Sequence, residues 1–248
     1  MELNHLKVNQ IVDSISETHK FNKQKLFAVN TSDVLDGDFL SSELLDINKL
    51  KGQFKKTIKK NDILFSEIRP ANKRFAKVDF DETSDYVIST KLMVLRKFNN
   101  DIDLDYFYYW LTNDINLKIL QSRAENRICS FPQITFDILS EYDVPVPCME
   151  SQIKIAGLLK NIDLKIKKNK KIIDTLENLT SCYFSYWFLQ CEFPDDNGKA
   201  YKSNDGKLIY NNRLKRYIPD GWVVEDLMNN SLCRDIKAGV KYFSTKNY

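Results

Sequence analysis

Basic side chains gather between Lys51 and Lys77. Nine residues of this stretch are lysine or arginine, and its acidic residues are Asp62 and Glu67, so its local charge is nine less two, or +7. A local excess of positive charge attracts phosphate groups even where a whole chain is nearly neutral, and the net charge here is +3. The stretch therefore indicates a phosphate-binding surface, and a lysine-rich face that meets only solvent is the alternative left open by charge alone.

The residue types needed for catalysis are sparse. The two histidines, His5 and His19, lie in the entry segment, and no glycine-rich phosphate loop is present. No two prolines are adjacent, so the Asn-Pro-Pro-aromatic signature of adenine methyltransferases is absent. The cysteines are widely spaced, without a Cys-x-x-Cys pair. We therefore predict no catalytic residue, no metal site and no cofactor.

One loose match to a metal-dependent nuclease pattern is Pro194-Asp195 followed by Asp205-Gly206-Lys207. Such sites place their carboxylates on adjacent strands, where they hold Mg²⁺. Here both halves lie in Asn- and Gly-rich sequence that is typical of turns, so we reject a nuclease site.

Composition fits a globular chain with 43% hydrophobic and 29% charged residues. No run approaches the roughly 20 apolar residues of a membrane span, and the first 20 residues resemble neither a signal nor a transit peptide. An odd number of dispersed cysteines favours a reducing cytoplasm.

Short apolar runs predict strands at Leu26–Val29, Ile63–Ser66, Tyr86–Thr90 and Leu92–Arg96. Arg69 precedes a proline, which favours an extended backbone there. A helix is predicted from Ile102 to Leu120, with one apolar face. That spacing favours core packing over base stacking for its aromatic residues. The face consists of Leu104, Phe107, Tyr108, Leu111, Ile115 and Ile119.

A proline-free helical pattern follows Pro147 and continues to about Gln190. Mostly large apolar residues recur in it at alternating spacings of four and three, which is typical of a coiled-coil seam. Asn169 interrupts the seam, and a buried polar residue there would fix the register of a helix pair. A long amphipathic helix lying on its own domain is the alternative. The seam consists of Ile155, Leu159, Ile162, Ile166, Asn169, Ile173, Leu176, Thr180, Tyr183 and Trp187.

The start of this helix resembles the conserved region of type I restriction–modification specificity (S) subunits. In that family a recognition domain ends on a short apolar strand, two prolines and a Pro-Leu-Glu-Glu-Gln-like start, before a helix with an Ile-Ala…Leu…Asp…Ile pattern. The matching residues are Pro145, Pro147, Glu150, Gln152, Ile155, Ala156, Leu159, Asp163 and Ile166.

Further points of resemblance lie on both sides of the helix. They are a Thr31…Gly37 element, an Asn61-Asp62-Ile63-Leu64 strand start, the Arg69-Pro70 loop, Ser89-Thr90 and Ile218-Pro219-Asp220-Gly221-Trp222. Family members often have glycine after the Ser-Thr pair, and this chain has Lys91.

The resemblance implies an α/β (α+β) target recognition domain at 1–147 and a long dimerisation and spacer helix at 148–190. A turn-rich linker at 191–222 and the start of an incomplete second recognition repeat at 223–248 would follow. It also implies a non-catalytic subunit that reads half of a bipartite target in double-stranded DNA. Methyltransferase (modification) subunits, and in some complexes a restriction subunit, would bind beside it.

Loop position then suggests the side chains that meet DNA. Lysines would hold phosphates, and other polar side chains would read base edges. For phosphates we predict Lys55, Lys56, Lys59, Lys60 and Lys73, and for bases Arg69, Asn72, Arg74, Ser89, Lys91, Arg123, Arg127 and Gln133.

The apolar seam needs a partner, so we predict a head-to-tail homodimer through Ile155, Leu159, Ile162, Ile166, Asn169, Ile173, Leu176, Tyr183 and Trp187. A coiled-coil interaction or scaffold protein without DNA binding is the competing class.

Overall fold

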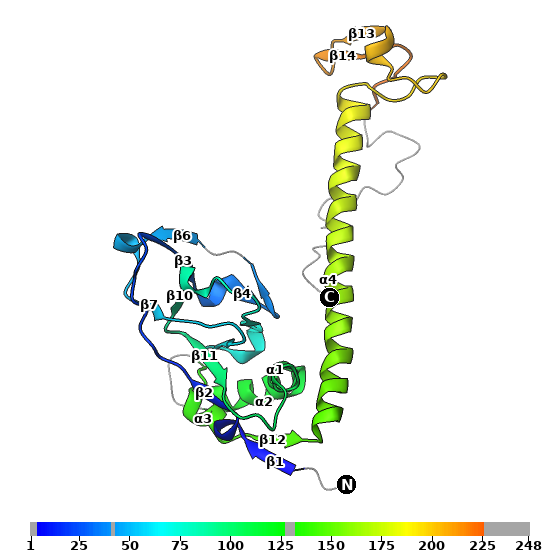
Figure 1. The fold of residues 1–248 in the computed structure, drawn as a ribbon. Coiled ribbons are helices and arrows are strands. Elements are labelled where there is room, and N and C mark those ends of the chain that lie inside the picture. Colours follow the sequence, from blue (N-terminus) through cyan, green and yellow to red (C-terminus); the bar gives the residue numbers. More distant parts are fainter. Residues whose placement is uncertain (1–3, 41–42, 127–131, 226–248) are drawn as a thin grey trace. The chain divides into compact units, whose positions relative to one another are not determined.

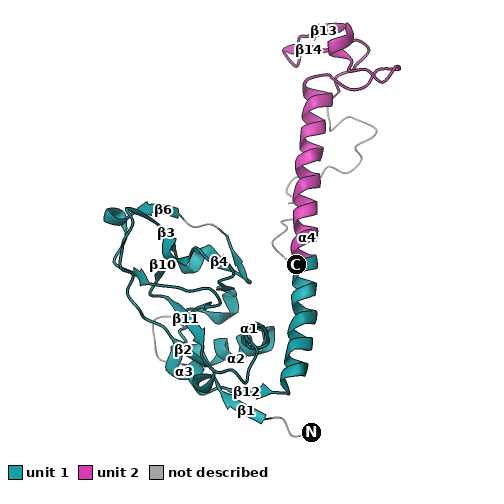
Figure 2. Cartoon of the chain, viewed as in Figure 1, with its two compact units in different colours: residues 1–165 teal, residues 166–248 magenta. Residues whose placement is uncertain are grey.

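The structure, a computed structural model, describes residues 4–40, 43–126 and 132–225. The chain divides into two compact units, Met1–Lys165 and Ile166–Tyr248, which Figure 2 colours separately. Most of the second repeat predicted at 223–248 lies outside the described residues.

The first unit is built on two four-stranded sheets (Figure 1). One is antiparallel throughout, in the order β2 (Val12–Ser14), β11 (Leu92–Lys97), β8 (Ile63–Ser66) and β9 (Phe75–Lys77). The other has the order β6 (Glu43–Asp46), β3 (Lys25–Val29), β10 (Tyr86–Ser89) and β7 (Phe54–Lys56). In this sheet β3 and β10 are parallel, and the other neighbours are antiparallel.

Two smaller antiparallel pairs complete the strands of this unit. They are β1 (Asn4–Lys7) with β12 (Asp143–Val146), and β4 (Val34–Leu35) with β5 (Asp38–Phe39). Single 3₁₀ turns connect the strands, at η1 (Val8–Gln10), η2 (Thr31–Asp33), η3 (Ile47–Lys49), η4 (Pro70–Asn72) and η5 (Thr83–Asp85).

The central strands β8 and β11 are apolar on both faces because each face packs on a different core. Ile63 and Phe65 belong to a cluster with the helices, whereas Leu64 packs with Val29 and Ile88 of the other sheet. Successive side chains of a strand point to opposite faces. Uninterrupted apolar runs in the sequence therefore became strands buried on both sides.

Three helices cover the first sheet: α1 (Leu104–Thr112), α2 (Asp114–Glu125) and α3 (Phe136–Ser140). The single helix predicted from Ile102 to Leu120 is wrong, because Asn113 has an extended backbone and caps α2 by accepting from the Asn116 amide at 2.8 Å. The break moves Ile115 and Ile119 off the buried face, leaving them 71% and 43% exposed. In α1 the prediction of core packing is confirmed, since Phe107 and Leu111 are fully buried.

Helix α4 (Met149–Phe184) continues as a π-helical turn, η6 (Ser185–Leu189). The predicted α/β (α+β) domain followed by a long helix is thus confirmed, and the coiled coil itself stays a prediction.

The second unit contains the distal part of α4, a 3₁₀ turn η7 (Lys202–Asn204) and a hairpin of β13 (Leu208–Asn211) and β14 (Arg216–Pro219). The Phe193 ring stacks on Tyr201 and on Trp222. The hairpin was not predicted within the linker assigned to 191–222. Asp195 of the rejected nuclease pattern accepts hydrogen bonds from the amides of Asn197 and Lys199 in its own turn.

Candidate nucleic-acid interface

The turn between β7 and β8 presents Lys59 and Lys60 to solvent. Asp62 directly precedes β8, and it is 1% exposed. Its carboxylate accepts from the Lys59 amide at 2.7 Å and from the Arg96 guanidinium at 2.8 and 2.7 Å. Lys60 forms an exposed ion pair with Asp81 at 2.9 Å. The buried Asp62 therefore holds the backbone of the turn by a hydrogen bond, while the side chains of Lys59 and Lys60 are exposed.

The loop between β8 and β9 has an unusual backbone. Arg69 and Lys73 flank η4, and both have positive φ values, of 48° and 53°. The proline after Arg69 led us to predict an extended backbone for that residue, and this prediction is wrong. The Arg69 amide donates to the Pro132 carbonyl at 3.1 Å, and Pro70 is buried, so the surrounding structure imposes the conformation. Strain of this kind in residues other than glycine concentrates at functional sites.

Three loops converge beside this turn. The Glu67 amide donates to the Lys91 carbonyl at 3.2 Å, and the Glu67 carbonyl accepts from the Ile134 amide at 2.8 Å. Gln133 donates through Nε2 to Glu67 Oε2 at 2.7 Å. Residues 67–74, 89–91 and 132–134 form what we call the loop cluster, which brings together Arg69, Lys91 and Gln133 from separate parts of the sequence.

Helix α2 flanks the loop cluster. Gln121 Oε1 accepts from the Ala71 amide at 3.2 Å, and Asp114 pairs with Lys73 at 2.8 Å. The hydrogen bond between Lys73 and Asp114 raises the pKa of Lys73 and lowers that of Asp114. Arg123 lies over the Tyr142 ring, 4.6 Å from its centroid, and remains exposed.

Two of the predicted DNA-binding side chains do not fit a contact with DNA. Lys56 is 9% exposed, and its ammonium donates to the Leu92 carbonyl at 2.8 Å, so burial lowers the pKa of this lysine. Ser89 is fully buried. We remove both from the candidate set because neither side chain reaches the surface.

The remaining candidates differ in how they are held. Arg74 is half-buried and donates to the carbonyls of Ser32 and Val34 at 3.2 Å, which restricts its reach. Arg127 lies outside the described residues. The exposed candidates are Lys55, Lys59, Lys60, Arg69, Asn72, Lys91 and Arg123, and Lys73 and Gln133 are half-buried in the same region.

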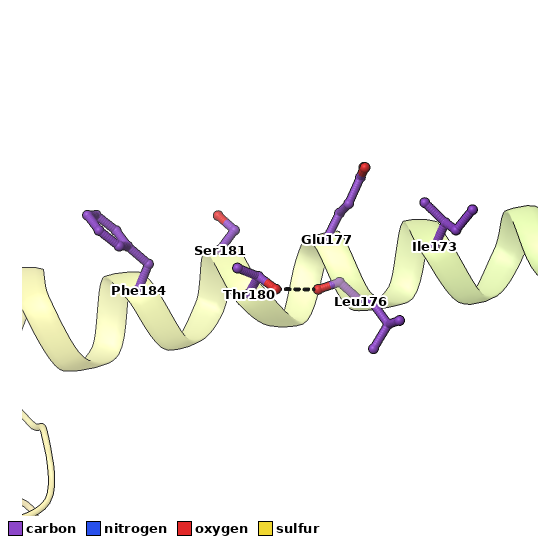
Figure 3. Close-up of a pocket in the computed structure, with 6 residues that line it drawn as sticks. All are labelled: Ile173, Leu176, Glu177, Thr180, Ser181 and Phe184. Carbon is purple, nitrogen blue, oxygen red and sulfur yellow. Dashed lines mark hydrogen bonds between the residues drawn. The ribbon is translucent and has the colours of Figure 1, made fainter. Parts of the chain in front are cut away.

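The seam of α4 faces solvent. Within the described part of the helix only Gln152 and Ala156 are buried. The large apolar seam residues from Ile162 to Trp187 are between 37% and 54% exposed, and Ile155 is 43% exposed. An apolar pocket lies on this helix, and Figure 3 shows the residues that line it: Ile173, Leu176, Glu177, Thr180, Ser181 and Phe184. The Thr180 hydroxyl donates to the Leu176 carbonyl at 2.8 Å, so its polar group is satisfied within the helix.

Comparison with known proteins gives the family. Residues 6–178 match the model of the type I restriction modification DNA specificity domain. The chain belongs to this specificity-domain family. The match includes the loop cluster, α4 as far as Asn178, and all the strands of the first unit apart from the start of β1.

Individual relatives agree with this assignment. The chain is similar to the type I restriction enzyme HindI specificity subunit of Haemophilus influenzae, at 38% identity over 203 residues. It is also similar to the MjaIX specificity subunit of Methanocaldococcus jannaschii, at 29% identity over 123 residues. These alignments cover 82% and 50% of this chain, but 44% and 26% of the relatives. The chain thus matches less than half the length of either.

Solved structures share the fold of this specificity domain. The crystal structure of the HsdS subunit from Thermoanaerobacter tengcongensis has a TM-score of 0.57 at 17% identity, covering 79% of this chain and 51% of that one. A chain from a study of complex assembly and conformational transition of the type I R-M system also has a TM-score of 0.57, at 15% identity. It covers 84% of this chain and 55% of that one.

The specificity domain anchors the first turns of α4 through Gln152, which is fully buried. Its Oε1 accepts from the Asp103 amide at 2.7 Å, and its Nε2 donates to the carbonyls of Asp101 and Pro147 at 3.1 and 2.8 Å. The sequence comparison had matched Gln152 to the family pattern without giving it a role. Its three bonds now show that it joins the helix start to the cap of α1.

Charged groups add to this joint between α1 and α4. Asp105 accepts from Lys77 of β9 and from Lys160 of α4, and Tyr109 donates to Asp163 at 2.7 Å. Burial alone would raise the pKa of Asp105, but the two lysines outweigh it and hold that pKa below its usual value.

Sequence reasoning missed the loop-cluster role of Glu67, which it counted only as an opposing charge. Its position directly after a buried strand was the available signal, because side chains at strand ends lie on loops that carry function.

Among the described residues no group of three or more His, Cys, Asp or Glu side chains is arranged to hold a metal ion, and no described helix is long and apolar enough to cross a membrane.

Proposed function

We propose that this chain recognises a specific sequence in double-stranded DNA, as the targeting subunit of a type I restriction–modification complex. The observation that carries the proposal is the loop cluster, where Arg69, Lys91 and Gln133 from three loops meet on a constrained backbone. Family membership supports it independently. In this role the chain itself is non-catalytic.

The proposed recognition divides between phosphates and bases. Exposed Lys55, Lys59 and Lys60, with Lys73, would hold the backbone, since lysine acts on phosphate as a mobile point charge. Residues on the constrained loops would read base edges, because base reading needs side chains that are already in place. We assign this role to Arg69, Asn72, Lys91 and Gln133 and to Arg123 of the flanking helix α2, with Arg74 and Arg127 as further candidates.

Methyltransferase (modification) subunits are the proposed partners that supply catalysis, and a restriction subunit is a further one. One of the solved structures that share this fold comes from work on complex assembly of the type I R-M system, which fits such a partnership. We also propose that residues 1–147 act as the recognition domain, 148–190 as spacer and docking helix, 191–222 as a linker, and 223–248 as the start of a second repeat.

A homodimer through α4 is part of the proposal. The exposed stripe of Ile155, Ile162, Leu176 and Trp187 needs cover, and a second copy offers the same stripe in a head-to-tail pairing. Two identical recognition domains would then read the two halves of an inverted repeat.

The first test is a long-read methylome of cells that express this chain with its methyltransferase subunit. A gapped palindromic motif supports both DNA recognition and the symmetric dimer. A gapped asymmetric motif supports recognition but assigns the second half-site to another chain. No new methylation, together with no salt-dependent DNA binding by the purified complex, would favour the coiled-coil scaffold.

Lys59→Ala tests the phosphate contacts in a mobility-shift titration at several salt concentrations. Loss of one phosphate contact should make the slope of log affinity against log salt concentration shallower by about 0.9. It should also weaken binding to all DNA sequences alike. Lys154→Ala removes an exposed lysine that pairs with Glu150 on α4 and serves as the matched control. An unchanged slope in Lys59→Ala would exclude Lys59 from the contact.

A further inference from the structure

Glu67 is the acidic residue of the loop cluster, and it lies at its centre. Its backbone amide and carbonyl bond to Lys91 and Ile134, so it joins the other two loops of the cluster. The residue is half-buried. Its backbone thus fixes the position of a carboxylate on the surface that we assign to DNA.

The carboxylate is oriented as well as placed. Gln133 donates through Nε2 to Oε2 at 2.7 Å, and the backbones of Ile68 and Gln133 form an antiparallel bridge. The charge of Glu67 also acts on the buried ammonium of Lys56, opposing the effect of burial on that lysine. Within the described residues no group donates a hydrogen bond to Glu67 Oε1, which leaves one acceptor oxygen available.

A carboxylate is the wrong charge for a phosphate contact. Two like charges about 4 Å apart repel by about 1 kcal/mol in water and by more near a protein surface. In the major groove, by contrast, a carboxylate accepts a hydrogen bond from the amino group of cytosine. Adenine presents a similar amino group at N6. Glu67 therefore suits a base edge that donates, while Arg69 and Lys91 beside it suit groups that accept.

We propose that Glu67, oriented by Gln133, is a specificity-determining residue that accepts a hydrogen bond from the exocyclic amino group of one base in the target. Gln133 is then a positioning residue for this carboxylate, in place of the base contact assigned to it above. The inference rests on the proposed function. It goes beyond it by giving the chemical class of one base in the recognised sequence.

Glu67→Gln is the discriminating variant. The amide keeps an oxygen that accepts from Gln133, and it replaces the other acceptor by a donor without changing the shape of the side chain. We expect the complex that contains Glu67→Gln to methylate a motif that differs from the wild-type motif at a single base pair, where the base requirement is relaxed or altered. Discrimination at that pair should fall about tenfold, within the range of a lost base contact. The wild-type motif at that pair shows whether cytosine or adenine supplies the amino group.

Controls separate the possible failures. Glu82→Gln replaces an exposed glutamate outside the cluster and should leave the motif unchanged. A wild-type chain that directs no methylation, and whose purified complex shows no salt-dependent DNA binding, would overturn the proposed function. A wild-type motif that Glu67→Gln leaves unchanged at every position would overturn this inference alone.

A second measurement covers a variant that methylates nothing. The purified Glu67→Gln complex would be titrated with duplexes that differ at one base pair at a time. Loss of preference confined to one pair supports base reading. An equal loss of affinity for all duplexes would mean that Glu67 only fastens the loops, and would overturn the inference.

Discussion

Asp62 shows how one buried side chain shapes a functional turn. It is 1% exposed and accepts three hydrogen bonds, one from the Lys59 amide and two from the Arg96 guanidinium. Hydrogen bonding to Asp62 raises the pKa of Arg96, so the guanidinium stays charged. The outward position of Lys59 and Lys60 thus depends on the buried carboxylate of Asp62.

Asp62→Ala should destabilise the recognition domain by about 3 kcal/mol, because it leaves the Arg96 charge and the Lys59 amide without their acceptor. Urea unfolding measures the change in the free energy of unfolding. Asp81→Ala, which removes the exposed partner of Lys60, should cost less than about 1 kcal/mol. A loss in Asp62→Ala no larger than in this control would show that the network adds little stability.

For single residues, the sequence predicted which side chains lie on loops better than it predicted which side chains are buried. Arg69, Asn72 and Lys91 are exposed on loops, in line with their assigned role. Lys56 follows Phe54 at the spacing of two that places side chains on one face of a strand, and that face is buried. The alternation was thus a signal that Lys56 points inward. The convergence of three loops on Glu67 depends on long-range pairing, which local patterns do not encode.

Among the elements, the strands followed directly from apolar runs. β3, β8, β10 and β11 lie where they were predicted. The break between α1 and α2 was missed, although Asn113 is a residue type that favours the cap of a new helix. The parallel pairing of β3 with β10 joins strands separated by more than fifty residues. Pairing at that range is decided by the assembly of the core rather than by the strands themselves.

The joint between α1 and α4 depends most on Gln152. Gln152→Ala should cost about 3 kcal/mol, because it removes a fully buried side chain that bonds one amide and two carbonyls. Hydrogen exchange should accelerate at residues 149–160 more than in the sheets, since the helix start loses its attachment. Glu150→Ala, an exposed neighbour, should change stability by less than about 0.5 kcal/mol. Uniform exchange across the domain would contradict a local role for Gln152.

At the scale of the whole molecule, α4 carries more apolar surface than its described surroundings cover. From Ile162 to Trp187 its large seam residues remain 37% to 54% exposed. Contiguous exposed apolar surface of this kind marks an interaction site. Asn169 lies midway along the helical segment from Met149 to Leu189. A polar residue within the seam lowers affinity but limits the registers that two helices can adopt, which a fixed gap between two half-sites requires.

Leu176→Glu tests the dimer because it places a carboxylate in the seam, where a partner helix would have to bury it. The cost of burying an unpaired charge should weaken the dimer more than about 100-fold, as measured by sedimentation equilibrium. Lys171→Glu introduces the same residue on the opposite face of the helix, about 140° away from Leu176 at 100° per residue, and should leave the dimer intact. In cells, Leu176→Glu should also abolish methylation of a palindromic motif while leaving the fold of the recognition domain unchanged. A dimer that tolerates Leu176→Glu would mean that the seam is not its interface, and that the recognition domains are brought together by other subunits of the complex.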